Sequence, residues 1–430
     1  MTIIAVALMC VAVARAEDEF VPQMECIDGI WYETFMPSKE TVPSNHPGER
    51  KNCAEVLGVG AGEVFARVCR NEDEEIVPIS SDLTIPSHVT IGGMEYEVIA
   101  TGKYSLGKIT NGATVTLPST IKLIGSGSVW ANHEYLNMGQ VEFDEAYVRI
   151  PESIIVVEAL CFFGLKSKHD VYLPEVSLLD VSSLGGLTVS KLTLGPKLTA
   201  MRDNCIPVVE ELVFADGDEN ATRWDDFGIE KGYTYICPDA ICSTNLRELK
   251  LPKWEKLELC DHFISYNKAL ERIVFPDITL IRYGFGSGFI GVSTPPFYGY
   301  FIEECPNLRE VVSLGEIPPR VNIISDFSNR IGYEGTSGEF EFMDNIDDCV
   351  LKVPAGSEEL YRADPVWGKF KTIYGFENGD YTSIVMPEVA APDAEAVPVY
   401  HNLQGMRVER PEHGQLYIRT VGSRTDKVVF

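Results

Sequence analysis

Long apolar runs and basic residues are both scarce in this sequence. No stretch after residue 16 is apolar enough to cross a bilayer, so the sequence predicts no transmembrane segment. The 36 Lys and Arg are outnumbered by 64 Asp and Glu, which gives a formal net charge of −28. Phosphate-rich surfaces repel such an acidic chain. We therefore expect neither nucleic acid nor an anionic lipid surface among its partners.

The common signatures of catalytic and metal sites are missing or incomplete. His133-Glu134 opens like a zinc-protease motif, but Asn137 stands where the second His belongs. The sequence has no Cys-x-x-Cys pair and no Gly-x-Ser-x-Gly elbow. We therefore predict no catalytic residue, no metal and no cofactor, and a protein that is not an enzyme. A glycan-active enzyme is the weaker alternative, because 64 acidic residues will form some close carboxylate pairs.

The sequence does contain a repeated unit. The clearest copies are LRELKLP at 246–252 and LERIVFP at 270–276, which lie 24 residues apart (276 − 252). Apolar residues that alternate with polar ones before a Pro predict a short strand with one buried face. One such strand cannot bury that face alone, but stacked copies can. The repeat therefore predicts a solenoid.

We call this repeated pattern, a short strand that ends at a Pro, the frame. Ten positions hold the terminal Pro or the residue that replaces it. They are Pro86, Pro118, Pro151, Pro174, Gly195, Ala215, Pro252, Pro276, Leu314 and Pro354. The second position of each strand should point away from the core. That row is Thr84, Thr116, Arg149, Tyr172, Thr193, Val213, Lys250, Val274, Val312 and Lys352. Many solenoids bind partners through such a row, and the alternative is an ordinary exposed strand face.

The frame resembles the leucine-rich repeats of the BspA-like family of secreted and surface proteins of Bacteroidetes. The stretches that carry the resemblance are VRIPESII at 148–155, VTLPSTI at 115–121, CPNLREV at 305–311, and LKVPAGSEELY at 351–361 followed by VWGKF at 366–370. The resemblance implies a β-rich solenoid of short parallel strands joined by turns or short helical pieces. One departure is the missing Asn of the turn, because Trp254 and Ile278 stand where it is expected.

Five segments follow from these patterns. Residues 1–16 read as a signal peptide, with an apolar run at 3–13 and cleavage between Ala16 and Glu17. Residues 17–82 form an N-terminal β cap, with strands at 29–35 and 63–69, and residues 83–376 form the solenoid. Residues 377–397 are a linker rich in Ala, Pro and acidic residues. Residues 398–430 form a small β tail, similar to the sorting segments of secreted Bacteroidetes proteins; a plain terminal hairpin is the alternative.

The cysteines and the clustered aromatics are the remaining candidates for chemistry. Cys161 and Cys205 each lie ten residues after the residue that ends the strand of their repeat, Pro151 and Gly195. The repeated position favours buried free thiols. Cys237 and Cys242 close a short loop and are the best candidates for a disulfide. Aromatic residues cluster in the longest intervals between the ten strand-ending positions, which we interpret as insertions in the repeat. Such insertions often form the binding side of a solenoid. The candidate ligand-binding residues are Trp130, Trp224, Tyr233, Phe297, Tyr298 and Tyr300.

The function that this reading and the resemblance imply is binding at the cell surface. We expect an exported protein, at the cell surface or outside the cell, that adheres to a protein or glycan of the host or of a neighbouring cell. A periplasmic location is the alternative if the tail has no export role. The competing function is a structural envelope or spacer protein without a specific ligand. In that case the aromatic rings of the insertions would pack onto the core.

Overall fold

A computed structural model describes residues 20–43, 50–135, 141–215, 234–237, 239–253, 257–260, 262–277, 280–284, 300–324, 341–377, 379–381, 399–402, 407–408, 416–421 and 424–429. The chain divides into two compact units, one ending at Gly379 and one beginning at Asp380. The predicted cleavage residues Ala16 and Glu17 lie outside the described residues, as does most of the predicted linker. The segment boundaries set by sequence therefore stay predictions.

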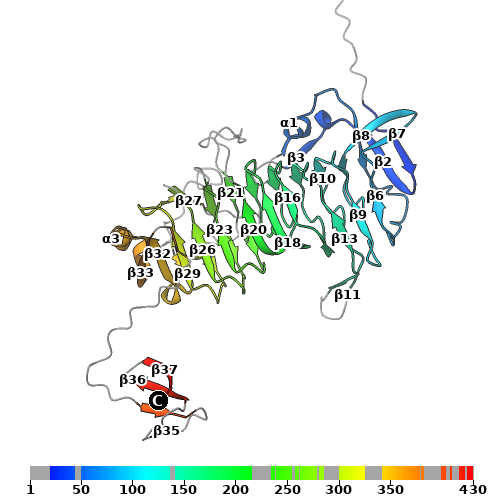
Figure 1. The fold of residues 1–430 in the computed structure, drawn as a ribbon. Helices are drawn as coiled ribbons and strands as arrows, with labels where there is room; N and C mark the ends of the chain where they lie inside the picture. Colours follow the sequence, from blue (N-terminus) through cyan, green and yellow to red (C-terminus); the bar gives the residue numbers. More distant parts are fainter. Residues whose placement is uncertain are drawn as a thin grey trace, which may run out of the picture. The chain divides into compact units, whose positions relative to one another are not determined.

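The first unit is a coil of short strands that stack in chain order from β2 to β33 (Figure 1). One long sheet runs along it. Its strands, in spatial order, are β1 (Met24–Ile27), β2 (Ile30–Phe35), β5 (Phe65–Val68), β8 (Met94–Thr101), β10 (Leu123–Ile124), β14 (Val156–Val157), β17 (Leu178–Leu179), β19 (Ala200–Met201), β21 (Thr234–Ile236), β24 (Leu257–Cys260), β27 (Leu280–Gly284) and β30 (Arg320–Ile324), with β7 (His88–Ile91) beside β8. β2 pairs antiparallel with β5, as the cap prediction expects, and β5 then pairs parallel with β8.

Two further sheets contain the strands of the repeated frame, and we call them the frame sheets. The first has the order β16 (Val171–Leu173), β18 (Leu187–Leu194), β15 (Leu165–Lys166), β13 (Tyr147–Arg149), β9 (Thr114–Thr116), β6 (Leu83–Thr84), with β20 (Val208–Phe214) on β18. The second has the order β23 (Glu248–Lys250), β26 (Arg272–Phe275), β29 (Glu310–Ser313), β32 (Val350–Pro354), β33 (Thr372–Phe376). All their pairings are parallel.

A third side of the coil and a few small elements complete the first unit. The third side is β22 (Ile241–Cys242), β25 (Ile264–Ser265), β28 (Tyr300–Glu303) and β31 (Glu341–Met343). Two hairpins join β3 (Thr41–Pro43) to β4 (Arg50–Asn52) and β11 (His133–Tyr135) to β12 (Val141–Phe143). Among the described residues the helical pieces are η1 (Pro37–Lys39), α1 (Cys53–Leu57), η3 (Ile346–Asp348), α3 (Glu358–Ala363) and η4 (Trp367–Lys369). The predicted β-rich solenoid with short helical pieces is thus confirmed.

The register of the frame sheets follows the predicted row. Thr84 pairs with Thr116 and Thr116 with Arg149, and the pairing continues in the same phase at later steps. Those later pairs are Tyr172 with Thr193, Thr193 with Val213, Lys250 with Val274, Val274 with Val312, and Val312 with Lys352. The row is offset between Arg149 and Tyr172, because β13 pairs with β15 and not with β16. β15 and β16 lie one after the other along the same edge of β18, with residues 167–170 between them.

The prediction that this whole row faces away from packed structure is wrong at its C-terminal end. Val274, Val312 and Lys352 are only 3%, 0% and 2% exposed. Strands β26, β29 and β32 are therefore buried on both faces, whereas Thr84 and Arg149 at the other end are exposed. Lys352 is buried as part of an ion pair, with Nζ 3.1 Å from Glu310 Oε1.

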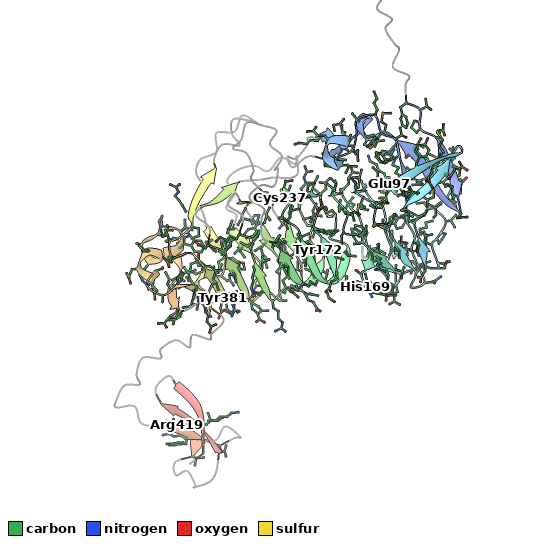
Figure 2. The ribbon with its side chains drawn as sticks, turned by 45° about the horizontal axis from the view of Figure 1, so that its top comes forward. Glu97, His169, Tyr172, Cys237, Tyr381 and Arg419 are labelled. Carbon is green, nitrogen blue, oxygen red and sulfur yellow. The ribbon has the colours of Figure 1, made fainter. Side chains whose placement is uncertain are left out.

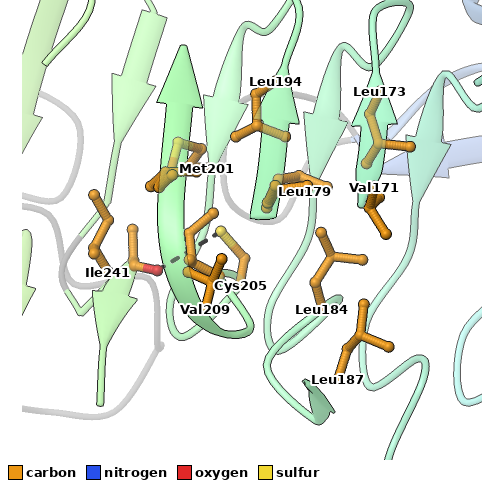
Figure 3. Close-up of a cluster of buried hydrophobic side chains, with 14 of the residues drawn as sticks. Val171, Leu173, Leu179, Leu184, Leu187, Leu194, Met201, Cys205, Val209 and Ile241 are labelled. Atoms are coloured by element: carbon orange, nitrogen blue, oxygen red, sulfur yellow. Dashed lines mark hydrogen bonds between the residues drawn. The ribbon is translucent and has the colours of Figure 1, made fainter. Parts of the chain in front are cut away.

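The core between the sheets is built from the inward residues of each turn. Figure 3 shows one layer of it around Cys205, whose Sγ lies 3.9 Å from the Ala240 carbonyl oxygen. Leu173, Leu179 and Leu194 in this layer have no exposed surface. Full burial of such a side chain contributes roughly 1.5–3 kcal/mol, so the stacked leucines hold neighbouring turns together.

Polar side chains also hold the turns. Asn267, 1% exposed, donates from Nδ2 to the Ile241 and Ser265 carbonyls and accepts from the Thr244 amide at 2.7 Å. A buried Asn therefore does join successive turns, but not where the repeat frame led us to expect it.

The second unit is a small antiparallel sheet. Its order is β35 (Arg407–Val408), β34 (Val399–His401), β36 (Leu416–Val421), β37 (Arg424–Val429). These strands lie in the segment predicted as a β tail.

Candidate functional site

A hollow lies on the outer side of the first frame sheet, over strands β6, β9 and β13. Its volume is ≈ 230 Å³. It is lined by Asp82, Thr84, Thr114, Thr116, Tyr147, Val148, Arg149, Lys168 and His169. Three of these, Thr84, Thr116 and Arg149, belong to the predicted outward row. We call this site the strand-face hollow.

Strand alternation places most of the lining residues. Val115 and Val148 point into the core with 0% and 1% exposure, so the residues on either side of them point outward. The predicted outward row contains only the residue after each of these buried positions. Extending the same alternation two residues upstream gives Asp82, Thr114 and Tyr147, so the signal for these residues was present in the sequence.

Lys168 and His169 come from a turn that follows β15. The Ser167 hydroxyl donates to the His169 carbonyl at 2.7 Å and accepts the His169 amide at 3.3 Å, which fixes this turn. The turn places Lys168 Nζ 3.7 Å from the centroid of the Tyr147 ring. Figure 2 labels His169 and Tyr172 along this part of the solenoid. The repeat frame does not mark β15, which is why sequence reasoning missed both residues of the turn.

The basic groups of the hollow are not neutralised by the described carboxylates. Asp82 Oδ1 accepts the Thr114 amide at 2.8 Å. The Tyr147 hydroxyl donates to the Glu145 carboxylate, and this contact raises the pKa of Tyr147. No described Asp or Glu lies within ion-pair distance of Arg149 or Lys168. Two cations are therefore open to a ligand in a chain of net charge −28.

The second frame sheet differs, because its outward charges pair with one another. Glu248, Arg272 and Glu310 are adjacent in register. Arg272 contacts Glu248 at 3.0 Å and Glu310 at 2.5 Å, and Lys352 contacts Glu310 at 3.1 Å. We call Glu248, Arg272, Glu310 and Lys352 the charge ladder. Because these charges pair with one another, they attract a charged ligand only weakly.

The predicted aromatic site is only partly within the described residues. Trp224, Tyr233, Phe297 and Tyr298 lie outside them. Trp130 is half-buried and packs across Gly107, where an added Cβ would meet the ring at 2.3 Å. Tyr300 is the half-buried first residue of β28. The packing alternative is thus favoured for Trp130, whereas the ligand-binding role of all six residues stays a prediction.

The cysteines whose side chains the structure describes are free thiols. Cys161 and Cys205 are buried and free, as predicted. Cys237 and Cys242 are also free, so the predicted disulfide between them is not formed. Cys237 is buried and directly follows β21 in the chain, whereas Cys242 lies in β22 beside Ser243, with Sγ 3.4 Å from the Ser243 hydroxyl.

No metal centre or membrane helix is found in the described part of the chain. It holds no group of three or more His, Cys, Asp or Glu that could bind a metal ion. Within the same residues, no helix is long and apolar enough to cross a membrane.

The leucine positions of the two clearest repeats decide the type of solenoid. Leu246, Leu249 and Leu251 are 1%, 0% and 5% exposed, and their counterparts Leu270, Ile273 and Phe275 are 1%, 0% and 0% exposed. β23 and β26 pair in parallel at this step. The chain is a leucine-rich repeat solenoid.

Comparison with solved structures finds proteins described in the same terms. One is a leucine-rich repeat protein from Bacteroides ovatus, with 14% identity, 68% of this chain and 80% of that chain covered, and a TM-score of 0.22. Another is a leucine-rich cell surface protein from Faecalibacterium prausnitzii, with 13% identity, coverage of 74% and 92%, and a TM-score of 0.20.

A third is the pneumococcal vaccine antigen PcpA, with 13% identity, coverage of 82% and 98%, and a TM-score of 0.22. No family model matches the sequence, and comparison with curated proteins gives no match. At these identities and TM-scores, the description of this solenoid rests on its own strand register and burial.

Proposed function

We propose that this solenoid is an exported surface protein that binds another macromolecule through the strand-face hollow. The observation that carries the proposal is a polar group in which Thr84, Arg149 and Lys168 are exposed and Thr116 is half-buried, with no described carboxylate paired to its cations. The proposal that the protein is exported rests on its predicted signal peptide, with an apolar run at 3–13 and the Ala-Arg-Ala site before Glu17.

The shape of the hollow favours a macromolecular ligand over a small molecule. Its ≈ 230 Å³ is below the roughly 300–1,000 Å³ of typical small-molecule pockets. Its polar groups are spread over three neighbouring strands, which lie about 4.8 Å apart in a sheet. An extended ligand that crosses the strands would reach all of them.

The hollow gives no support to a two-carboxylate enzyme. Asp82 is its one acidic lining residue, and Oδ1 of that carboxylate already accepts the Thr114 amide. Glycosidases need two carboxyl groups about 5–10 Å apart. We therefore propose binding rather than catalysis at this site.

The spacer alternative is favoured by a separate observation. Phe301, in one of the aromatic insertions, is 1% exposed, and its ring centroid lies 4.6 Å from that of Phe263. Trp130 is packed as well. Aromatics that serve only packing are what a spacer predicts, so the binding proposal depends on the strand face and not on these two rings.

A binding screen of the purified chain tests the proposal. We expect a saturable ligand among immobilised extracellular-matrix proteins and a glycan array, and binding at least about tenfold weaker for the Arg149→Ala/Lys168→Ala variant, a loss of about 1.4 kcal/mol. The matched control, Lys103→Ala/Lys253→Ala, removes two exposed cations elsewhere and should bind normally. Absence of any ligand would support the spacer alternative.

A further inference from the structure

We propose that the ligand of the strand-face hollow is an acidic polysaccharide, a sugar chain that carries carboxylate or sulfate groups. This inference rests on the proposed function and adds the chemical class of the ligand. The charges, the hydroxyl groups and the lack of exposed apolar surface at the site point to this class.

The charges select an anionic group. Arg149 is exposed and can hold a carboxylate or sulfate through two parallel N–H bonds. Lys168 Nζ is held over the Tyr147 ring, 3.7 Å from the centroid, so its position is fixed before a ligand arrives. The net charge of −28 repels anions at long range, but charges beyond about 8 Å are largely screened at physiological salt. Close to the sheet, the cations Arg149 and Lys168 outnumber the one acidic lining residue, Asp82, whose Oδ1 accepts the Thr114 amide.

The contrast with the charge ladder locates the site. Arg272 and Lys352 on the second frame sheet already contact Glu248 and Glu310 at 2.5–3.1 Å. Arg149 has no such contact with the described carboxylates. An acidic ligand would therefore gain more binding free energy at the strand-face hollow than at the charge ladder, although both sites lie on parallel strands of the frame sheets.

The hydroxyl groups suit a sugar chain. Thr84, Thr114 and Thr116 present hydroxyls on adjacent strands, and each can both donate and accept a hydrogen bond. Beyond them, Tyr172 is 44% exposed on the same frame sheet and offers a ring for stacking. Sugar hydroxyls need both donors and acceptors along their length, which this row supplies.

An acidic peptide fits less well. Protein partners gain most of their binding free energy from apolar and aromatic anchors at the centre of the interface. The one aliphatic lining residue, Val148, is 1% exposed, and a cation covers one face of Tyr147. The centre of the hollow thus offers no apolar pocket for a peptide anchor.

Calorimetric titration of the full chain tests the inference with four probes: heparin, hyaluronan, neutral dextran and polyglutamate. We expect heparin or hyaluronan to bind, and dextran and polyglutamate not to bind. Binding should weaken by at least about tenfold when NaCl rises from about 50 to about 500 mM, because the contact is ionic. The Arg149→Ala/Lys168→Ala variant should lose about tenfold in affinity, Arg149→Lys should lose less, and Lys103→Ala/Lys253→Ala should match the parent. Thermal melting of each variant confirms that it is folded.

Several results overturn the inference, and they differ from failure of the proposed function. If dextran, polyglutamate or a matrix protein binds and the hollow variant abolishes that binding, the function stands and the acidic-sugar class is wrong. If heparin or hyaluronan binds equally to the parent and to the hollow variant, the site is wrong. If no probe and no ligand of the wider screen binds, the proposed function itself fails.

Discussion

Asp203 is a carboxyl group on the turn that follows β19. Its Oδ1 is buried and has no hydrogen-bond partner among the described residues. Burial, together with the nearby carboxylates of Asp239 and Asp180, raises the pKa of Asp203 to about 6. In the unfolded chain its pKa would be about 3.9. The folded state therefore binds this proton more tightly than the unfolded state.

This difference predicts how stability depends on pH. Between about pH 4 and pH 6 the folded Asp203 holds more proton than the unfolded one, so its contribution becomes less favourable as pH rises through this window and is fully unfavourable above it. Asp203→Asn should stabilise the protein at pH 7 by about 1 kcal/mol, after allowance for partial exposure of the group. At pH 4 the gain should vanish.

Urea unfolding at the two pH values measures this effect. Asp73→Asn is the matched control, because Asp73 is exposed and the charge change is the same. An equal effect of both substitutions at pH 7 would show that net charge, and not burial of Asp203, is responsible.

The thiols show the same influence of burial on single residues. Burial raises the pKa of Cys305 and of Cys349 to about 12. Thiolate is the reactive form of cysteine, so burial disfavours the reactive form of these side chains in the folded protein. Their role is that of small apolar side chains in the turns.

At the scale of the elements, Gly195 explains why one frame mark departs from Pro. A Cβ at this position would lie 2.1 Å from the Pro174 carbonyl oxygen and 2.5 Å from its carbonyl carbon. Those atoms belong to the backbone that follows β16, the neighbouring strand in the sheet, and cannot move away cheaply. The Gly195 amide also donates to the Leu173 carbonyl at 2.9 Å. Two adjacent turns therefore approach too closely here for any side chain.

Gly195→Ala should for this reason destabilise the fold by about 1–3 kcal/mol, the usual cost of overpacking. Gly62→Ala serves as the control, since nothing lies within 4 Å of an added Cβ there and Gly62 is exposed. Denaturant unfolding of the two variants measures the difference. A Gly195→Ala protein as stable as the parent would mean that β16 and β18 can separate without loss.

At the scale of the whole first unit, an aromatic cluster closes the C-terminal end of the coil. Trp367 is fully buried, donates from Nε1 to the Pro319 carbonyl at 2.9 Å, and packs edge-on against Phe275 with centroids 5.4 Å apart. Tyr361 donates to the Gly315 carbonyl at 2.8 Å in the same cluster. A solenoid needs such a cap because its last turn would otherwise expose the apolar section of the core.

Trp367→Ala should cost about 3–5 kcal/mol, as expected for deleting a buried Trp. Because each turn contacts mainly its neighbours, the loss should be felt first at the C-terminal end. Native-state hydrogen exchange should show reduced protection in β29, β32 and β33, while β9 and β13 keep theirs. Leu360→Ala in the adjacent helix α3 is the control, since Leu360 is 55% exposed. Uniform loss of protection would indicate that the unit unfolds as one body.

The repeat and its phase can be predicted from local patterns in the chain. Alternation around Val115 and Val148 is a local property of the chain, and so is the Pro or Gly that ends each strand. These were enough to predict that Thr84, Thr116 and Arg149 lie side by side. Local patterns also predicted the buried thiols of Cys161 and Cys205.

Which outward positions stay exposed depends on how distant turns pack against them. Lys352 and Arg149 occupy the same position in the frame, yet Lys352 is buried against Glu310 while Arg149 is exposed. Likewise, Lys168 reaches the Tyr147 ring from a residue 21 positions later in the chain (168 − 147). Exposure and pairing depend on what packs against a strand from other turns, and the alternation within one strand carries no information about those neighbours.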